Sequence, residues 1–233
     1  MESRVSEIPT EKVDVLVVAA HAPDLAGMRA ALGENLNAHI RGLFVCGKAI
    51  GIGAPMAAVG MTGRIKQLAP RAVVMIGTCA VYPGQSTYRP NDVVVANRFT
   101  LVDPNVLAQR ASFPAPMQTT VEAPALMCQG IATIGNRARM APIASTLGST
   151  TDDALAAQLL AATGCEAENL EAYSVALACS SLQIPFACVF GVSNVAGSRA
   201  SEDWRQFHRS AVTAAADVLT NWVHAGAPGM PHH

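Results

Sequence analysis

Short apolar segments alternate with helix-like segments along almost the whole chain, and this order constrains the fold more than any other feature of the sequence. Apolar runs of about four to eight residues between turn signals are typical of buried strands. Strands that alternate with helices predict an α/β fold, in which a central, twisted, mostly parallel or mixed sheet lies between two layers of helices. The expected strands are residues 13–20, 43–48, 72–76, 92–97, 130–134, 141–145 and 185–192.

The segments between these strands predict helices, some with recognisable starts. A proline stands near the first turn of the expected helix at 23–32, and Thr151 or Asp152 suits the N-cap of a later helix. Residues 101–121 hold three prolines and little periodicity, which predicts an irregular segment on the substrate side. The expected helices are residues 23–32, 56–68, 121–130, 152–162, 170–182 and 201–223.

The length of the chain suits one large domain, since 233 residues can bury a substantial core. The sequence shows no internal repeat and no linker. We therefore expect a single domain at 13–224, preceded by an N-terminal extension at 1–12. A flexible tail rich in glycine, proline and histidine is expected at 225–233.

Composition and charge argue against several classes of partner. The net charge of −1 indicates no nucleic-acid partner. No apolar run approaches the roughly 20 residues that span a bilayer, so we expect no membrane association. The first residues lack the apolar segment of a secretory signal. The six cysteines form no CxxC pair and lie mostly in apolar segments. This favours reduced core thiols, a cytoplasmic location and no metal site.

Two polar segments near the ends of predicted elements suggest a binding site. Asn169-Leu170-Glu171 opens the helix expected at 170–182, and Ser193-Asn194 follows the strand expected at 185–192. Ligands of such sheets bind beyond the carboxyl ends of the strands. A carboxylate can hold a sugar diol and an amide can hold a base edge. The pair therefore suggests a nucleoside site.

Four segments, taken in order, resemble the nucleoside phosphorylase and nucleosidase superfamily. They are the glycine-rich turn at 51–58, the strand and Gly77-Thr78-Cys79-Ala80 at 70–80, Asn169-Leu170-Glu171-Ala172, and Ser193-Asn194. The last two are similar to the Glu-Met-Glu and Ser-Asp signatures of purine nucleoside phosphorylases, methylthioadenosine nucleosidases and futalosine hydrolase-like enzymes. The resemblance covers about 13–223. It implies a phosphorylase-like three-layer fold, cleavage of an N-glycosidic bond, and a homo-oligomer (dimer, trimer or hexamer).

The resemblance also implies roles for individual residues. Glu171 would hold the ribose hydroxyls while positive charge grows at the anomeric carbon, and Leu170 would pack on the sugar. The remaining residues of the implied substrate-binding set are Gly77, Thr78, Cys79, Asn169 and Ser193. Simpler interpretations stay open: Glu171 could only answer its own helix dipole, and 77–80 could be a tight turn. The turn at 51–55 is favoured as structural, with a secondary ligand role.

Asn194 is the main departure from the family pattern. Most purine members have aspartate here, which protonates N7 of the leaving base. Asparagine has no acidic proton, but it can donate to O6 and accept from a protonated N7, which favours a 6-oxopurine or futalosine-like nucleoside. Some futalosine-cleaving nucleosidases look similar, with Ser-Asn followed by Arg and Trp, here Arg199 and Trp204. The alternative is a turn residue that bonds its own backbone.

Two further departures concern the acceptor of the ribosyl group. The hydrolytic branch has a glutamate as water base after its first strand, and Ala22 is read at that place. His21 or Asp24 could substitute, and His21 is the first choice because its imidazole can accept a proton near pH 7. The phosphate-binding arginines are replaced by Met75 and Phe190. Four arginines that could reach a site, or simply lie on the surface, are Arg41, Arg64, Arg137 and Arg139.

These patterns together favour hydrolysis of a purine-type nucleoside, with Asn194, Glu171 and His21 as catalytic residues and no cofactor. The first alternative is phosphorolysis to base and ribose 1-phosphate, with inorganic phosphate as co-substrate, which the turn at 51–58 favours. The second is a catalytically silent nucleoside- or base-binding protein, since the family's water base is replaced.

Overall fold

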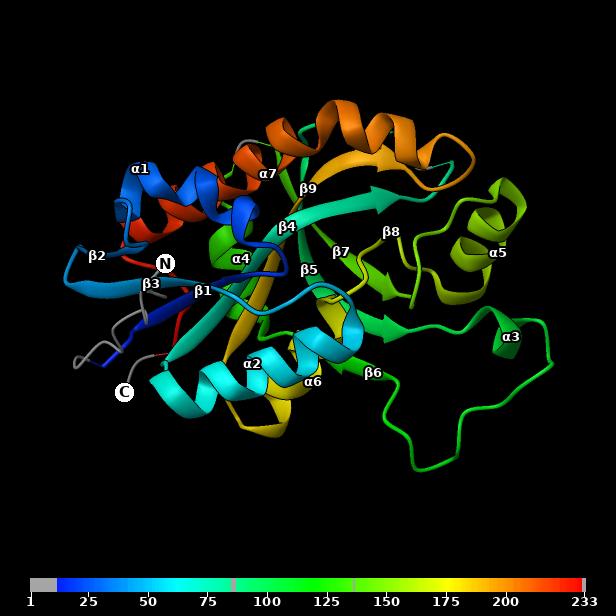
Figure 1. Ribbon diagram of the computed structural model, residues 1–233, viewed down its shortest axis with the longest axis horizontal. Helices are drawn as coiled ribbons and strands as arrows, with labels where there is room; N and C mark the ends of the chain where they lie inside the picture. The colour runs from blue at the N-terminus through cyan, green and yellow to red at the C-terminus, as the bar shows by residue number, and fades with distance from the viewer. Residues whose placement is uncertain (1–11, 85–86, 136, 232–233) are drawn as a thin grey trace, which may run out of the picture.

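A computed structural model describes residues 12–84, 87–135 and 137–231 of the chain. A central sheet lies between two layers of helices (Figure 1). Residues 1–11 of the expected N-terminal extension and 232–233 of the expected tail lie outside the described residues. The expected α/β class with a mixed central sheet is confirmed.

The sheet contains nine strands in the described part of the chain, in the order β2-β3-β1-β4-β8-β7-β5-β6, with β9 paired to both β4 and β5. It is mixed, because β1, β3, β4 and β9 run parallel while β5 pairs antiparallel with β9. The strands are β1 (Val15–Ala19), β2 (Asn37–Ile40), β3 (Leu43–Ala49), β4 (Ala72–Val81), β5 (Val93–Leu101), β6 (Thr120–Glu122), β7 (Ala138–Ser145), β8 (Ala167–Glu168) and β9 (Phe186–Val195).

Part of the sheet closes on itself. The pairings β4–β8, β8–β7, β7–β5, β5–β9 and β9–β4 form a complete circuit. The two-residue strand β8 closes the circuit at the ends of β4 and β7. The carboxyl ends of β4 and β9 lie beside β8, because Val81 of β4 pairs with both Ala167 of β8 and Val195 of β9.

The helices cover the two faces of the sheet (Figure 1). They are the 3₁₀ helix η1 (Ala22–Met28) and the α-helices α1 (Arg29–Leu32), α2 (Ala54–Leu68), α3 (Pro104–Leu107), α4 (Ala125–Ala132), α5 (Asp153–Thr163), α6 (Ala172–Ser181) and α7 (Ala200–His224). One core cluster lies beneath α2 and α6, and a second joins η1, α4 and α7 to the other face. Asp152 caps α5 by accepting from the amide of Leu155, as expected for one of the two candidate caps.

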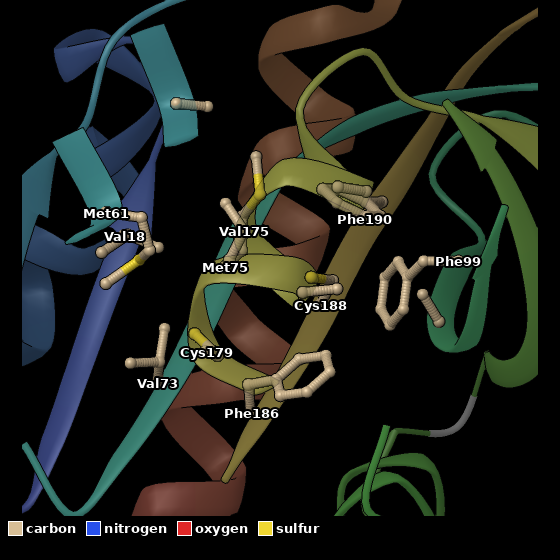
Figure 2. Packing of buried hydrophobic residues seen from close by; sticks show 14 of the residues in the cluster. Val18, Met61, Val73, Met75, Phe99, Val175, Cys179, Phe186, Cys188 and Phe190 are labelled. Atoms are coloured by element: carbon tan, nitrogen blue, oxygen red, sulfur yellow. The ribbon is translucent and has the colours of Figure 1, made fainter. Parts of the chain in front are cut away.

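Figure 2 shows part of the core cluster beneath α2 and α6. Val175 and Cys179 of α6 belong to it, together with Met75 of β4 and Cys188 of β9. All six cysteines of the chain are buried and free of disulfides. This agrees with their interpretation as small apolar core residues.

Several expected boundaries are wrong. Residues 77–80 do not form a loop, since they continue β4 and pair with β9 as far as Val195. Ser193 and Asn194 likewise lie within β9 rather than beyond it. Residues 130–134 form the end of α4 and a turn instead of a strand, because a short apolar run does not distinguish strand from helix. The short strands β2 and β8 were not expected.

The expected irregular segment at 101–121 is only partly irregular. Strand β5 extends to Leu101, α3 begins after the N-cap Asp103, and β6 begins at Thr120. Near the end of the chain, Ala227 and Met230 are buried, and the indole of Trp222 donates to the carbonyl of Pro228. None of the described helices is both long enough and apolar enough to cross a membrane.

Candidate active site

Glu171 connects the starts of two helices. It is the N-cap residue of α6, yet its side chain does not cap that helix. Its Oε1 instead accepts a hydrogen bond of 2.8 Å from the amide of Gly53, the N-cap residue of α2. Gly53 has φ +84°, a conformation that favours glycine. The glycine-rich turn therefore aims a backbone donor at a carboxylate that is 5% exposed.

The pKa of Glu171 is affected by a second carboxylate, that of Asp24. Burial raises the pKa of Glu171, the amide donors of Gly53 and of Glu171 itself lower it, and Asp24 raises it again. Asp24 is therefore near enough to Glu171 for the two like charges to interact. Among the described residues other than Glu171 itself, only Gly53 donates to the Glu171 side chain, and it does so to Oε1. Oε2 therefore has no donor from another residue and can accept from a ligand.

Asp24 follows β1 within η1 and is half-buried. Burial raises its pKa, while the nearby imidazoles of His21 and His208 lower it. His21 is exposed and precedes η1 without capping it. His21 is therefore near enough to Asp24 to interact with its carboxylate, and Ala22, the residue read at the place of the family's glutamate, has no polar side chain.

Asn169 is part of the scaffold of the site. Its Oδ1 accepts from the amides of Glu171 and Ala172 at 3.0 and 2.8 Å, which caps α6. Its Nδ2 donates to the carbonyl of Thr78 at 3.0 Å and so ties α6 to β4. The hydroxyl of Ser145 donates to the Asn169 carbonyl. In this state the Asn169 side chain is used internally, whereas the resemblance implied contact with substrate.

The Ser193-Asn194 pair lies beside Cys79 on the neighbouring strand. The hydroxyl of Ser193 donates to Oδ1 of Asn194 at 2.7 Å and lies 3.2 Å from the Cys79 carbonyl. Nδ2 of Asn194 donates to the carbonyl of Val195 at 3.1 Å. Asn194 is 8% exposed, and these contacts match the alternative interpretation that it bonds its own backbone. One proton of Nδ2 stays available for a ligand.

Trp204 of α7 lies next to Thr78 of β4. Its Nε1 lies 3.3 Å from the hydroxyl oxygen of Thr78. Its ring stacks on His208 with centroids 4.3 Å apart and an interplanar angle of 17°. Trp204 is 45% exposed, so an aromatic face remains in reach of solvent.

The other predicted residues take positions without polar roles. Gly77 lies in β4 against the ring of Phe190, which is fully buried. Leu170 lies half-buried in the turn before α6. The structure therefore brings together Glu171, Asn169, Thr78, Cys79, Ser193 and Asn194 through hydrogen bonds and strand pairing.

The candidate phosphate-binding arginines are engaged elsewhere. Arg137 and Arg139 both pair with Asp92. Arg41 donates to the carbonyl of His224, and Arg64 to the side chain of Gln67. None of these contacts involves the six residues that the structure brings together around Glu171.

Sequence reasoning did not find His208 and did not favour Asp24 over His21. A signal for His208 was present, because Trp204 and His208 are spaced i, i+4 on a helix and must share a face. The position of Asp24 depends on η1 packing against α7, which no local pattern reports.

Residues 20–224 match the model of the phosphorylase superfamily, and the chain belongs to this superfamily. The structure is similar to a mutant of futalosine hydrolase from Helicobacter pylori strain 26695, with TM-score 0.80 and 16% identity over 91% of this chain and 99% of that chain. It is similar to the 5′-methylthioadenosine/S-adenosylhomocysteine nucleosidase from Neisseria meningitidis in complex with methylthio-immucillin-A, with TM-score 0.81 and 19% identity over 91% and 99%.

A third similar structure is the corresponding nucleosidase from Colwellia psychrerythraea 34H in complex with adenine, with TM-score 0.80 and 16% identity over 96% of this chain and 99% of that chain. A comparison with curated proteins gives no match. At these identities the structural likeness establishes the fold, and the phosphorylase-like architecture expected from the sequence is confirmed.

Proposed function

We propose that this protein cleaves the N-glycosidic bond of a purine-type nucleoside with water as the acceptor. The observation that carries the proposal is the buried Glu171 carboxylate, held by the Gly53 amide, with Asp24 close enough to act on it electrostatically. Cleavage needs one anion that stabilises the ribosyl cation and one base that takes a proton from water. We assign the first role to Glu171 and the second to Asp24.

Glu171 holds the sugar in this proposal. Its Oε2 and the second lone pair of Oε1 accept from the two ribose hydroxyls, while the Gly53 amide keeps the carboxylate oriented. As the C–N bond breaks, its electron pair leaves with the base and positive charge grows on the sugar. The fixed carboxylate stabilises that charge without reorganising.

Asp24 accepts the proton of the attacking water, and His21 acts with it. The raised pKa of a half-buried carboxyl brings it closer to the range in which a base is effective at neutral pH. His21 stabilises the charged form of Asp24. This changes the emphasis of the sequence-based prediction, in which His21 was the first choice to organise the water.

Asn194 recognises the base. The free proton of Nδ2 donates to O6 of a 6-oxopurine, and Oδ1 accepts from a protonated N7. Ser193 fixes the amide through its hydroxyl. These contacts support a 6-oxopurine or futalosine-like substrate. The neighbouring nucleosidases bind methylthio-immucillin-A and adenine, which makes a purine the reasonable class of base.

Phosphorolysis is disfavoured by the same geometry. The Gly53 amide, which begins α2 and would suit an anion, already donates to Glu171. A phosphate dianion there would be repelled by the carboxylates of Glu171 and Asp24, and the four candidate arginines make their contacts elsewhere.

A chromatographic screen tests this proposal. Inosine, guanosine, adenosine, 5′-methylthioadenosine and futalosine are each incubated with and without phosphate, and the base and sugar products are separated. Free ribose from a 6-oxopurine nucleoside supports the proposal. Ribose 1-phosphate formed only with phosphate supports the phosphorylase alternative, and base binding by calorimetry without turnover supports the silent binder. Light scattering tests the homo-oligomer implied by the resemblance.

A further inference from the structure

The 3₁₀ helix η1 packs closely against α7. A Cβ atom added to Gly27 of η1 would lie 2.8 Å from the Cβ of Ala216 on α7. Glycine at this position therefore permits a close approach of the two helices. Successive turns of a 3₁₀ helix place residues i and i+3 on the same side, so Asp24 faces α7 as Gly27 does.

His208 lies on the face of α7 that meets η1. His208, Val212 and Ala216 are spaced four residues apart and share one face of the helix. The added Cβ of Gly27 would also lie close to the carbonyl of Val212. Asp24 precedes Gly27 by one turn, which brings its carboxylate toward the His208 end of this face.

The imidazole of His208 is held in a defined position. Its ring stacks on Trp204, and Trp204 is anchored to the hydroxyl of Thr78. Nδ1 of His208 is buried and has no hydrogen-bond partner within the described residues. A buried nitrogen of this kind is costly unless a water or ligand group completes it.

We infer that His208 is a positioning residue, which holds the Asp24 carboxylate through one water in the orientation that accepts a proton from the attacking water. The inference rests on the proposed function, because it concerns the base of that reaction. The effect of His208 on the pKa of Asp24 agrees with this arrangement. Trp204, which bonds the hydroxyl of Thr78, stacks on the imidazole and fixes its ring plane.

Other charged groups near Asp24 and His208 also affect how the activity depends on pH. Near Asp24 these are His21 and Glu171, and Lys48 lies on β3, which also contacts η1. On α7 itself, Asp203 pairs with Arg199, whereas Arg209 is exposed. The substitution Arg209→Gln is thus a matched control. It removes a charge one residue away from His208 and leaves the face of α7 that meets η1 unchanged.

The first experiment measures kcat and KM for His208→Ala, His208→Asn and Arg209→Gln on the nucleoside that the screen identifies. We expect His208→Ala to lower kcat roughly 10-fold to 100-fold with KM changed less than about twofold. The acidic limb of its pH profile should move to higher pH. His208→Asn should recover part of the loss, because the amide of asparagine can occupy the place of Nδ1, and Arg209→Gln should match the unmodified protein. Equal kcat and pH profile in His208→Ala would overturn the inference.

The second experiment does not depend on turnover. Trp204 stacks on His208, so a change in the position of the imidazole should change the fluorescence of Trp204, and Trp204→Phe identifies that part of the signal. Asp24→Asn should change this fluorescence at a fixed neutral pH, because it removes the group that the imidazole holds, whereas Arg209→Gln should leave it unchanged. Unchanged fluorescence in Asp24→Asn would contradict the pairing. Changed fluorescence in a protein that cleaves no nucleoside would preserve the pairing and overturn the proposed function, so the two failures are distinguishable.

Discussion

The carboxylate of Glu171 accepts a hydrogen bond from the amide of Gly53, although 118 residues separate them in the chain. This contact joins the start of α2 to the start of α6. It orients one oxygen of the carboxylate and leaves the other for a ligand. The glycine-rich turn and the Glu-Met-Glu-like segment, which are separate motifs in the sequence, therefore form one structural unit.

Glu171→Gln should lower kcat/KM about 10²-fold to 10³-fold, because a neutral amide cannot stabilise the ribosyl cation as a carboxylate does. The amide oxygen can still accept from Gly53, so the fold should survive. Steady-state kinetics beside circular dichroism measures both effects. Glu122→Gln, at an exposed position, is the control. A Glu171→Gln variant with nearly normal kcat/KM would remove Glu171 from the proposed mechanism.

The same variant should be more stable than the unmodified protein at neutral pH. The pKa of Glu171 is raised above its ordinary value of 4.5, chiefly by burial. A raised carboxyl pKa means that the contribution to stability is present below the unfolded pKa and is lost as pH rises through the folded pKa. Thermal unfolding of Glu171→Gln should therefore show a higher Tm at pH 7, and the difference should shrink as pH falls below about 5. A lower Tm at pH 7 would show that the charged form is stabilised instead.

Asn169→Ala should lower the free energy of unfolding by about 1–2 kcal/mol. The substitution leaves the amides of Glu171 and Ala172 at the start of α6 without their acceptor and removes the bond to the Thr78 carbonyl, and losing such a helix-start acceptor costs about this much. Chemical denaturation measures the change. A loss of activity with unaltered stability would instead indicate the direct substrate contact that the family resemblance implied.

The order of strands and helices follows from local patterns, and the fold class could therefore be predicted from the sequence. The lengths of β4 and β9 could not, because Gly77 to Ala80 become strand by pairing with residues 190–194 of β9. Tertiary contact of this kind overrides local turn signals. The closure of the sheet through β9 has the same origin.

The candidate site was predictable where a residue lies at the start of an element, as Glu171 and Asn169 do. It was less predictable where packing between helices decides. The choice between His21 and Asp24 depends on how η1 meets α7, and His208 enters through that contact. The partners of Asn194 are its chain neighbours Ser193 and Val195, so its assignment to the base remains a prediction.

Asn194→Asp should move activity from 6-oxopurine toward 6-aminopurine nucleosides. Aspartate accepts from an exocyclic amine and can protonate N7, whereas asparagine donates to O6. The ratio of kcat/KM for inosine and adenosine, measured in both proteins, reports the change. If the unmodified protein cleaves adenosine as well as inosine, Asn194 does not select the base.

Asp24→Asn should lower kcat about 10²-fold or more, and His21→Ala should lower it less, because Asp24 takes the proton and His21 supports its charge. Product analysis should show the same sugar in each case. His39→Ala removes a histidine that stacks on Phe44, at the far end of β2 from this site, and serves as the control. Equal rates for Asp24→Asn and the unmodified protein would exclude Asp24 as the base.

The central claim is that water accepts the ribosyl group, and the most direct measurement identifies the sugar product in phosphate-free buffer. Inosine or futalosine is incubated with the protein, and the products are separated by chromatography with and without added phosphate. We predict free ribose, or the free 5′-substituted ribose, at a rate that phosphate does not change. Ribose 1-phosphate, formed with a turnover that depends on added phosphate, would contradict the account and establish phosphorolysis.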